Sequence, residues 1–133
     1  METEPTVELL NVDLELFGLV DSEPLLRCFG DAVLVIADEH LLSLELSDSP
    51  DSTLTTKLAE FVALVIALPE DARGAWNSAS RRVFNIGIQS GLRPSCTEWA
   101  IPTSILASLV EIRAEVTLTI YGAEYAQEKL SSR

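Results

Sequence analysis

The sequence is poor in the residues from which most catalytic and metal sites are built. It has one histidine, His40, and two cysteines, Cys28 and Cys96, which are too far apart in the chain to form a C-x-x-C pair. Its six glycines form no dinucleotide-binding or phosphate-binding fingerprint, and no serine lies in a G-x-S-x-G turn. We therefore predict a protein that is not an enzyme, with no catalytic residue, no metal ligand and no cofactor. Because free cysteines are usually buried, both thiols are predicted to be buried or half-buried.

The histidine has acidic neighbours in the segment Asp38-Glu39-His40. A metal site or an acid-base pair would need these three side chains to converge on one point. Consecutive residues on a turn point in diverging directions, and Asp is common in turns. The segment is therefore interpreted as a solvated hairpin turn rather than a metal or acid-base site.

Long apolar runs are also missing. The longest run, residues 61–68, is far shorter than the roughly 20 residues that a membrane-spanning helix needs. Residues 1–5 lack the basic and apolar regions of a secretory signal. These absences predict a cytoplasmic protein of bacterial type.

Basic residues are scarce in the first half of the chain. Residues 1–60 contain 14 acidic residues and only Arg27 and Lys57 as bases, whereas residues 61–133 contain seven of each sign. The whole net charge of -12 therefore arises in the first half. Such a surface repels the phosphates of nucleic acids and of anionic membranes, so neither is expected as a partner. A cationic protein would complement it, although the need for solubility accounts for the same charge.

The composition predicts one folded domain. The chain has 133 residues, of which 47% are apolar and 23% are charged, enough to form a core without disulfides or metals. Residues 1–6 and 123–133 are predicted to be flexible ends.

Two periodicities divide the chain into strands and helices. Residues 33–36 and 42–46 are extended, either as a hairpin or as one long strand with a bulge. Strict alternation of apolar and polar residues predicts strands over 10–16, 84–88 and 116–120. Helical spacing and helix-capping residues predict helices over 22–29, 53–68, 69–79 and 103–112.

The helix over residues 53–68 is apolar on nearly all sides. A helix of this kind is covered on more than one side. The sequence therefore predicts either an oligomer contact, such as a homodimer, or a second helix packed against it.

The alternating strands imply a sheet with one face on the helices and the other in water. The predicted fold class is α+β, a two-layer sandwich with a four- to five-stranded, mostly antiparallel sheet and helices on one face. The water-facing side is predicted to be polar and partly acidic. Its residues are Asp13, Glu15, Glu45, Asn85, Gln89, Thr117, Thr119 and Tyr121.

The order of these elements and three stretches of sequence resemble a bacterial family catalogued as domain of unknown function 4279. The closest stretch, IPTSILASLVEIRAEVTLTIY at residues 101–121, looks like that family's helix and its terminal strand ending in Ile-Tyr. Residues 11–18, NVDLELFG, and residues 61–72, FVALVIALPEDA, are similar too. The chain departs from the family pattern at residues 30–32 and at Arg113, where a glycine is usual. The resemblance implies a ferredoxin-like α+β sandwich and, because the family has no assigned activity, no catalytic residues.

The loop over residues 90–101 is a candidate binding site. Long loops without secondary structure often have a function, and Arg93 and Trp99 are of the residue types that anchor partners. The alternative is that Trp99 closes the end of the core and that Arg93 pairs with an acidic residue.

Two functions of different classes fit these observations. The first is a small acidic non-catalytic interaction protein that masks a basic protein partner, as immunity proteins mask basic nuclease toxins. The second is a small-molecule-binding or regulatory domain that uses residues 90–101. The candidate binding residues are Asp13, Glu15, Glu45 and Tyr121 on the open face of the sheet, and Arg93 and Trp99 in the loop.

Overall fold

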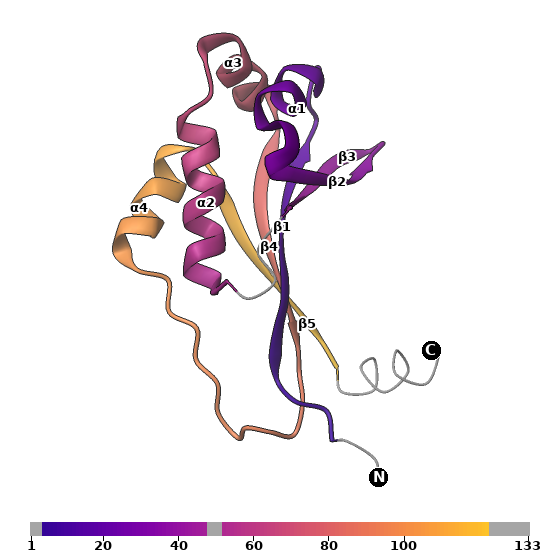
Figure 1. Cartoon of the computed structure of the whole chain (residues 1–133), viewed down its shortest axis with the longest axis vertical. Coiled ribbons are helices and arrows are strands. Elements are labelled where there is room, and N and C mark those ends of the chain that lie inside the picture. The colour runs from indigo at the N-terminus through magenta and orange to yellow at the C-terminus, as the bar shows by residue number, and fades with distance from the viewer. Residues whose placement is uncertain (1–3, 48–51, 123–133) are drawn as a thin grey trace.

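A five-stranded sheet carries four α-helices on one of its sides (Figure 1). The computed structural model describes residues 4–47 and 52–122. The elements follow the chain as β1 (Glu8–Phe17), α1 (Glu23–Phe29), a short 3-10 helix (Gly30–Ala32), β2 (Val33–Asp38), β3 (Leu41–Leu46), α2 (Leu54–Ile66), α3 (Glu70–Ser78), β4 (Arg81–Gln89), α4 (Thr103–Glu111) and β5 (Glu115–Tyr121).

The strands lie in the order β2-β3-β1-β4-β5. The pairs β2–β3, β1–β3 and β1–β4 are antiparallel, whereas β4 and β5 are parallel, because α4 carries the chain back across the sheet between them. The predicted α+β class is confirmed, with a mixed sheet. The first four strands follow the order of two split β-α-β units, because β3 lies between β1 and β2, and β1 lies between β3 and β4. The ferredoxin-like arrangement is nevertheless not confirmed for the whole sheet, because β5 adds a parallel strand next to β4.

The helix-facing side of the sheet forms the core. On β1 the alternation predicted from the sequence buries Val12, Leu14 and Leu16. Leu14 lies opposite Leu44 of β3 and Phe84 of β4, so one apolar row crosses three strands. Leu44 and Phe84 are fully buried as well.

Helix α2 packs on this apolar side and also contacts α4. Its first turn is capped by Thr53, whose side chain accepts a hydrogen bond from the amide of Thr56 at 3.2 Å. Phe61 meets the ring of Phe84 with 5.4 Å between the ring centroids. Of the two explanations for its apolar faces, the structure supports the packed second helix.

Side-chain hydrogen bonds to helix-end carbonyls join α3 to α4 and join both helices to β4. The indole of Trp76 is fully buried and donates to the carbonyl of Ile112 at 2.9 Å. The guanidinium of Arg82 donates to the carbonyls of Ala79 at 2.7 Å and of Arg113 at 3.0 Å. These bonds satisfy carbonyls that a helix end leaves without an intrahelical partner.

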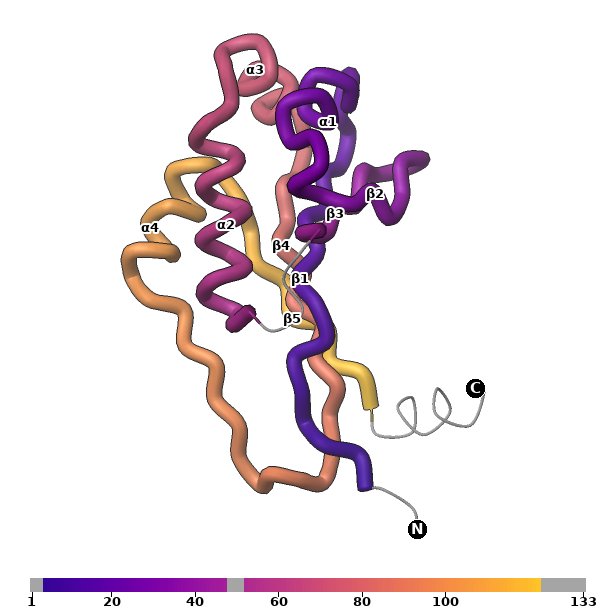
Figure 2. Tube along the Cα trace, viewed as in Figure 1, coloured from indigo at the N-terminus to yellow at the C-terminus, as the bar shows by residue number. Residues whose placement is uncertain are grey.

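Residues 33–38 and 41–46 are two separate strands of a hairpin, which settles the alternative left open by the sequence. Their register shifts between Val35 and Ala37, so β2 contains a bulge. Figure 2 shows this β2–β3 hairpin extending away from the helices.

Several smaller expectations are tested by the same structure. Cys28 and Cys96 are exposed, so the prediction of buried thiols is wrong. Cys28 lies on the outer side of a seven-residue helix that buries only Leu25 and Phe29, and Cys96 lies in the loop after β4.

No helix within the described ranges is long and apolar enough to cross a membrane. The expectation of a flexible end at 123–133 falls outside the described residues.

Candidate functional site

Three carboxylates lie side by side on the face of the sheet that is turned away from the helices. Asp13 of β1 lies directly opposite Glu45 of β3, and Glu15 is two residues further along β1 on the same face. We call Asp13, Glu15 and Glu45 the acidic face. The buried residues of all four helices belong to the core on the other side of the sheet, where Figure 1 shows α2 and α4. The polar face predicted from the sequence is therefore present at Asp13, Glu15 and Glu45, whereas Ser43 and Val83, on either side of Glu15, are buried.

Side-chain amides on β1 and β4 hold two of these carboxylates, Asp13 and Glu15, in place. Asn11 donates to both carboxylate oxygens of Asp13, at 3.2 and 3.3 Å. Asn85 of β4 donates to Glu15 at 3.3 Å and accepts a hydrogen bond from the hydroxyl of Thr119 at 2.7 Å. Asn11 lies over Gly87, where a Cβ atom would clash with its side-chain oxygen. A glycine at position 87 therefore lets the Asn11 amide lie across the sheet.

The charge on Asp13 is destabilised by its surroundings. Partial burial, and then the negative charges of Glu45 and Glu15, raise the pKa of Asp13 from 3.8 to about 6. None of the ion pairs found in the described ranges involves these three carboxylates. A positive group brought to this face from outside would offset the negative charges of Glu45 and Glu15.

The nearest basic residue on the same face is already paired. Arg81 lies opposite Phe17 at the end of β1, with its guanidinium carbon 5.3 Å from the centre of the Phe17 ring. Its guanidinium forms an ion pair with Glu115 of β5 at 3.2 Å. The hydrogen bond to Arg81 lowers the pKa of Glu115 and raises the pKa of Arg81. Arg81 therefore borders the acidic face, where its charge attracts that of Glu15, while its ion pair is with Glu115.

An exposed apolar edge lies next to the acidic face. Leu34, Val35 and Ile36 on β2 are 48%, 49% and 55% exposed. Leu34 lies opposite Glu45, so it continues the cross-strand row that contains Glu45 and Asp13. The sequence predicted an extended segment here but not its exposure. An apolar run in the sequence has the same pattern whether it forms a central strand or an edge strand. Only the order of the strands in the sheet distinguishes the two cases.

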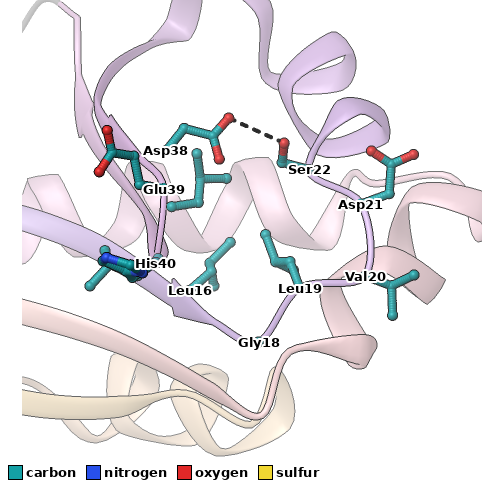
Figure 3. Close-up of a pocket in the computed structure, with 11 residues that line it drawn as sticks. Leu16, Gly18, Leu19, Val20, Asp21, Ser22, Asp38, Glu39 and His40 are labelled. Atoms are coloured by element: carbon teal, nitrogen blue, oxygen red, sulfur yellow. Dashed lines mark hydrogen bonds between the residues drawn. The ribbon is translucent and has the colours of Figure 1, made fainter.

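The hairpin turn at residues 38–40 borders a hollow of about 300 Å³ (Figure 3). Figure 3 shows Asp38 directed at Ser22, which donates a hydrogen bond to it at 3.4 Å, whereas Glu39 and His40 point elsewhere. Within the described ranges no three His, Cys, Asp or Glu side chains are placed to hold a metal ion. The interpretation of this segment as a diverging turn is confirmed.

The loop after β4 is anchored rather than open. Arg93 forms an ion pair with Glu4 at 3.1 Å, and its carbonyl accepts a hydrogen bond from the amide of Val7 at 2.8 Å. Trp99 is partly buried against the hydrophobic core. Both residues therefore have the structural roles that the sequence analysis gave as the alternative to binding.

The remaining candidate, Tyr121, lies at the far end of the open face. It is opposite Gln89 of β4, which in turn is opposite Glu8 of β1. Thr117 of β5 is in the row of Asn85 and Asp13, so four strand residues, about 13 Å, separate Tyr121 from that row. The structure groups Asp13, Glu15 and Glu45, and it leaves Tyr121, Arg93 and Trp99 apart from them.

Comparison with known proteins adds no further information about this surface. No protein-family model matches the chain, and neither a curated protein nor a solved structure matches it. Its function has to be inferred from the geometry and the charge of its own residues.

Proposed function

We propose that the chain is a non-catalytic interaction protein that binds a cationic protein through the acidic face. The observation that carries this proposal is the group of three carboxylates on adjacent strands, none of which has an ion-pair partner in the described residues. The net charge of -12 supports it, because long-range attraction accelerates the encounter with a basic partner.

The chemistry of the face favours arginine or lysine side chains of the partner. A guanidinium can bond two carboxylate oxygens at once, and it would lower the pKa of Asp13 by adding a positive charge beside it. The exposed Leu34 next to Glu45 supplies an apolar contact of the kind found at the centre of protein interfaces. An acidic surface with an apolar border suits a basic protein better than a nucleic acid or a membrane.

The wider biological setting belongs to the same proposal. We expect an immunity-like role, in which the chain covers a basic surface of its partner in a bacterial cytoplasm. We also propose kinship with the domain of unknown function 4279 family, and with it a ferredoxin-like α+β sandwich, on the sequence of residues 11–18, 61–72 and 101–121.

The alternative, a small-molecule-binding or regulatory domain that uses residues 90–101, has less support. Its two candidate side chains are engaged within the chain, because Arg93 pairs with Glu4 and Trp99 packs against the core. A metabolite screen that changes the fluorescence of Trp99 or the thermal stability would restore this alternative.

Affinity capture from the native host at low salt tests the interaction. The decisive variant replaces the three carboxylates by amides of the same shape, as Asp13→Asn, Glu15→Gln and Glu45→Gln. It should lose a partner that the unmodified chain captures in stoichiometric amount, because the positive groups of the partner lose their counter-charges.

A matched control changes the net charge equally on other parts of the surface. Glu70, Glu98 and Glu111 are exposed and lie on α3, in the loop after β4 and on α4. The triple Gln variant of these three residues should capture the partner as the unmodified chain does. Equal losses in both variants, or no stoichiometric basic partner at all, would refute binding through the acidic face.

A further inference from the structure

The two edge strands of the sheet, β2 and β5, differ in how readily each could pair with a strand of another molecule. The edge strand β2 carries a bulge and ends in the acidic turn that starts at Asp38, features that discourage pairing with another strand. The opposite edge strand, β5, is regular over all seven of its residues and contains no Pro, Gly or Lys. In the strand order of the described chain, nothing pairs with its outer side.

The backbone of β5 presents hydrogen-bonding groups at this outer edge. The carbonyl of Tyr121 accepts a hydrogen bond from the amide of Ser90 just after β4. The backbone N–H and C=O groups of Tyr121 therefore point toward β4. In a β-strand, successive residues direct their N–H and C=O groups to opposite sides. The N–H and C=O groups of Val116, Leu118 and Ile120 therefore point outward.

The side chains of the same three residues are more exposed than their pattern predicts. They lie on the core side of the sheet, since Val116, Leu118 and Ile120 are opposite the buried Phe84, Ile86 and Ile88 of β4. Nevertheless Val116, Leu118 and Ile120 are 38%, 59% and 63% exposed. The sequence predicted an inward face here, and its exposure follows from the edge position of β5.

The β5 edge is also electrically neutral. Glu115 is the only charged residue of the strand, and Arg81 of the same chain compensates it at 3.2 Å. Between residues 99 and 122 the only other charged residues are Glu111 and Arg113, which have opposite signs. In a chain with a net charge of -12, this is a surface on which a second copy meets little repulsion.

We propose that β5 pairs with β5 of a second copy of this chain, antiparallel and about a twofold axis at Leu118. In this register Leu118 faces Leu118 of the other copy, and Val116 faces Ile120. These are the residues whose N–H and C=O groups point outward, so each pair forms both hydrogen bonds of an antiparallel ladder. The apolar side chains form one stripe across the axis, and Glu115 lies opposite Tyr121 rather than another acid.

This pairing is independent of the proposed binding of a cationic protein. The acidic face lies on the polar side of β1 and β3, whereas the twofold contact uses the edge of β5 and the apolar side of the sheet. Two copies would form one ten-stranded sheet, with two acidic faces on the same side and an uncharged seam between them. The contact is isologous, as in most homodimers.

Disulfide trapping tests the register. Cys28 and Cys96 are exposed, so both are first replaced by serine. Leu118→Cys in this background should then give a covalently linked dimer on mild oxidation, because residues paired across the axis have Cα atoms about 5.5 Å apart. Ile120→Cys is the matched control. It is similarly exposed on the same strand, but its opposite residue is Val116, so it should form no disulfide-linked dimer under the same conditions.

The oligomeric state of the full chain provides the second test. Sedimentation equilibrium at micromolar concentrations should show a dimer that persists at high salt, which distinguishes it from binding through the acidic face. Leu118→Lys should weaken dimerisation roughly tenfold or more, because it places two like charges opposite each other at the axis. Leu34→Lys on the exposed β2 strand should leave the dimer intact.

Three results would overturn the pairing. One is a monomer at all concentrations tested. Another is a dimer that Leu118→Lys leaves unchanged although the variant is folded by circular dichroism. The last is a dimer that forms only after residues 123–133 are removed, which would mean that the end of the chain itself occupies the edge.

Discussion

At the scale of single residues, Asp13 is the group whose protonation is expected to affect folding. Its pKa of about 6 lies above the value of 3.8 for a carboxyl in the unfolded chain, so the folded state binds the proton more tightly. The stabilisation that this provides is complete below about pH 4 and is lost as the pH rises through about 6.

The variant Asp13→Asn should remove this dependence. Relative to the unmodified chain, its free energy of unfolding should change little near pH 4. Near pH 7 it should be higher by roughly 1 kcal/mol, less than the full pKa shift of Asp13 would give, because solvent screens a half-buried charge. Urea unfolding across this pH range measures the difference. Glu70→Gln on α3 controls for the loss of one charge. A difference between Asp13→Asn and the unmodified chain that does not vary with pH would contradict the proposed surroundings of Asp13.

At the scale of elements, α4 is attached to the rest of the fold by few side chains. Leu109 is its one fully buried residue, at 3% exposure, and the next residue, Val110, is 76% exposed. Removing the buried side chain leaves a cavity between α4 and its neighbours, whereas removing the exposed one does not.

Leu109→Ala should therefore lower the free energy of unfolding by roughly 2–4 kcal/mol, and Val110→Ala by less than about 0.5 kcal/mol. Denaturant titration of the two variants measures both effects. Similar losses for Leu109→Ala and Val110→Ala would mean that α4 is not packed through Leu109.

The helices and strands could be predicted from the sequence because their signals are local. The alternation of apolar residues in β1 and the helical spacing in α2 gave the types of these elements and their ends within about two residues. The polar face of the sheet followed from the same alternation, which placed Asp13, Glu15 and Glu45 together.

The strand order could not be predicted, because it depends on pairing between distant segments. The apolar residues of β2 and β5 have the same local pattern as those of buried strands, yet both strands lie at edges. For the same reason the exposed Leu34 beside Glu45 was missed, and the outward backbone of β5 was not foreseen. Only the assembled sheet shows which strands have neighbours on both sides.

At the scale of the whole molecule, the uneven charge predicts a response to salt. The net charge of -12 repels itself in the folded state, and the acidic face concentrates part of this repulsion on two adjacent strands. Sodium chloride shortens the range of the repulsion from about 10 Å at 0.1 M to about 3 Å at 1 M.

The midpoint of thermal unfolding should therefore rise with salt over this range. The rise should be smaller in the triple amide variant of Asp13, Glu15 and Glu45, because that variant has already lost its central repulsion. Scanning calorimetry measures both. A midpoint that falls as salt is added would show instead that ion pairs such as that of Arg81 with Glu115 dominate the stability.

The row of Glu8, Gln89 and Tyr121 has a mechanical consequence. It places the start of β1 and the end of β5 at the same end of the sheet, on either side of β4, about 10 Å apart. A force applied to these two points would act across the strands rather than along them. It would open the ladders one hydrogen bond after another, so the domain should yield at low force when it is stretched between its ends.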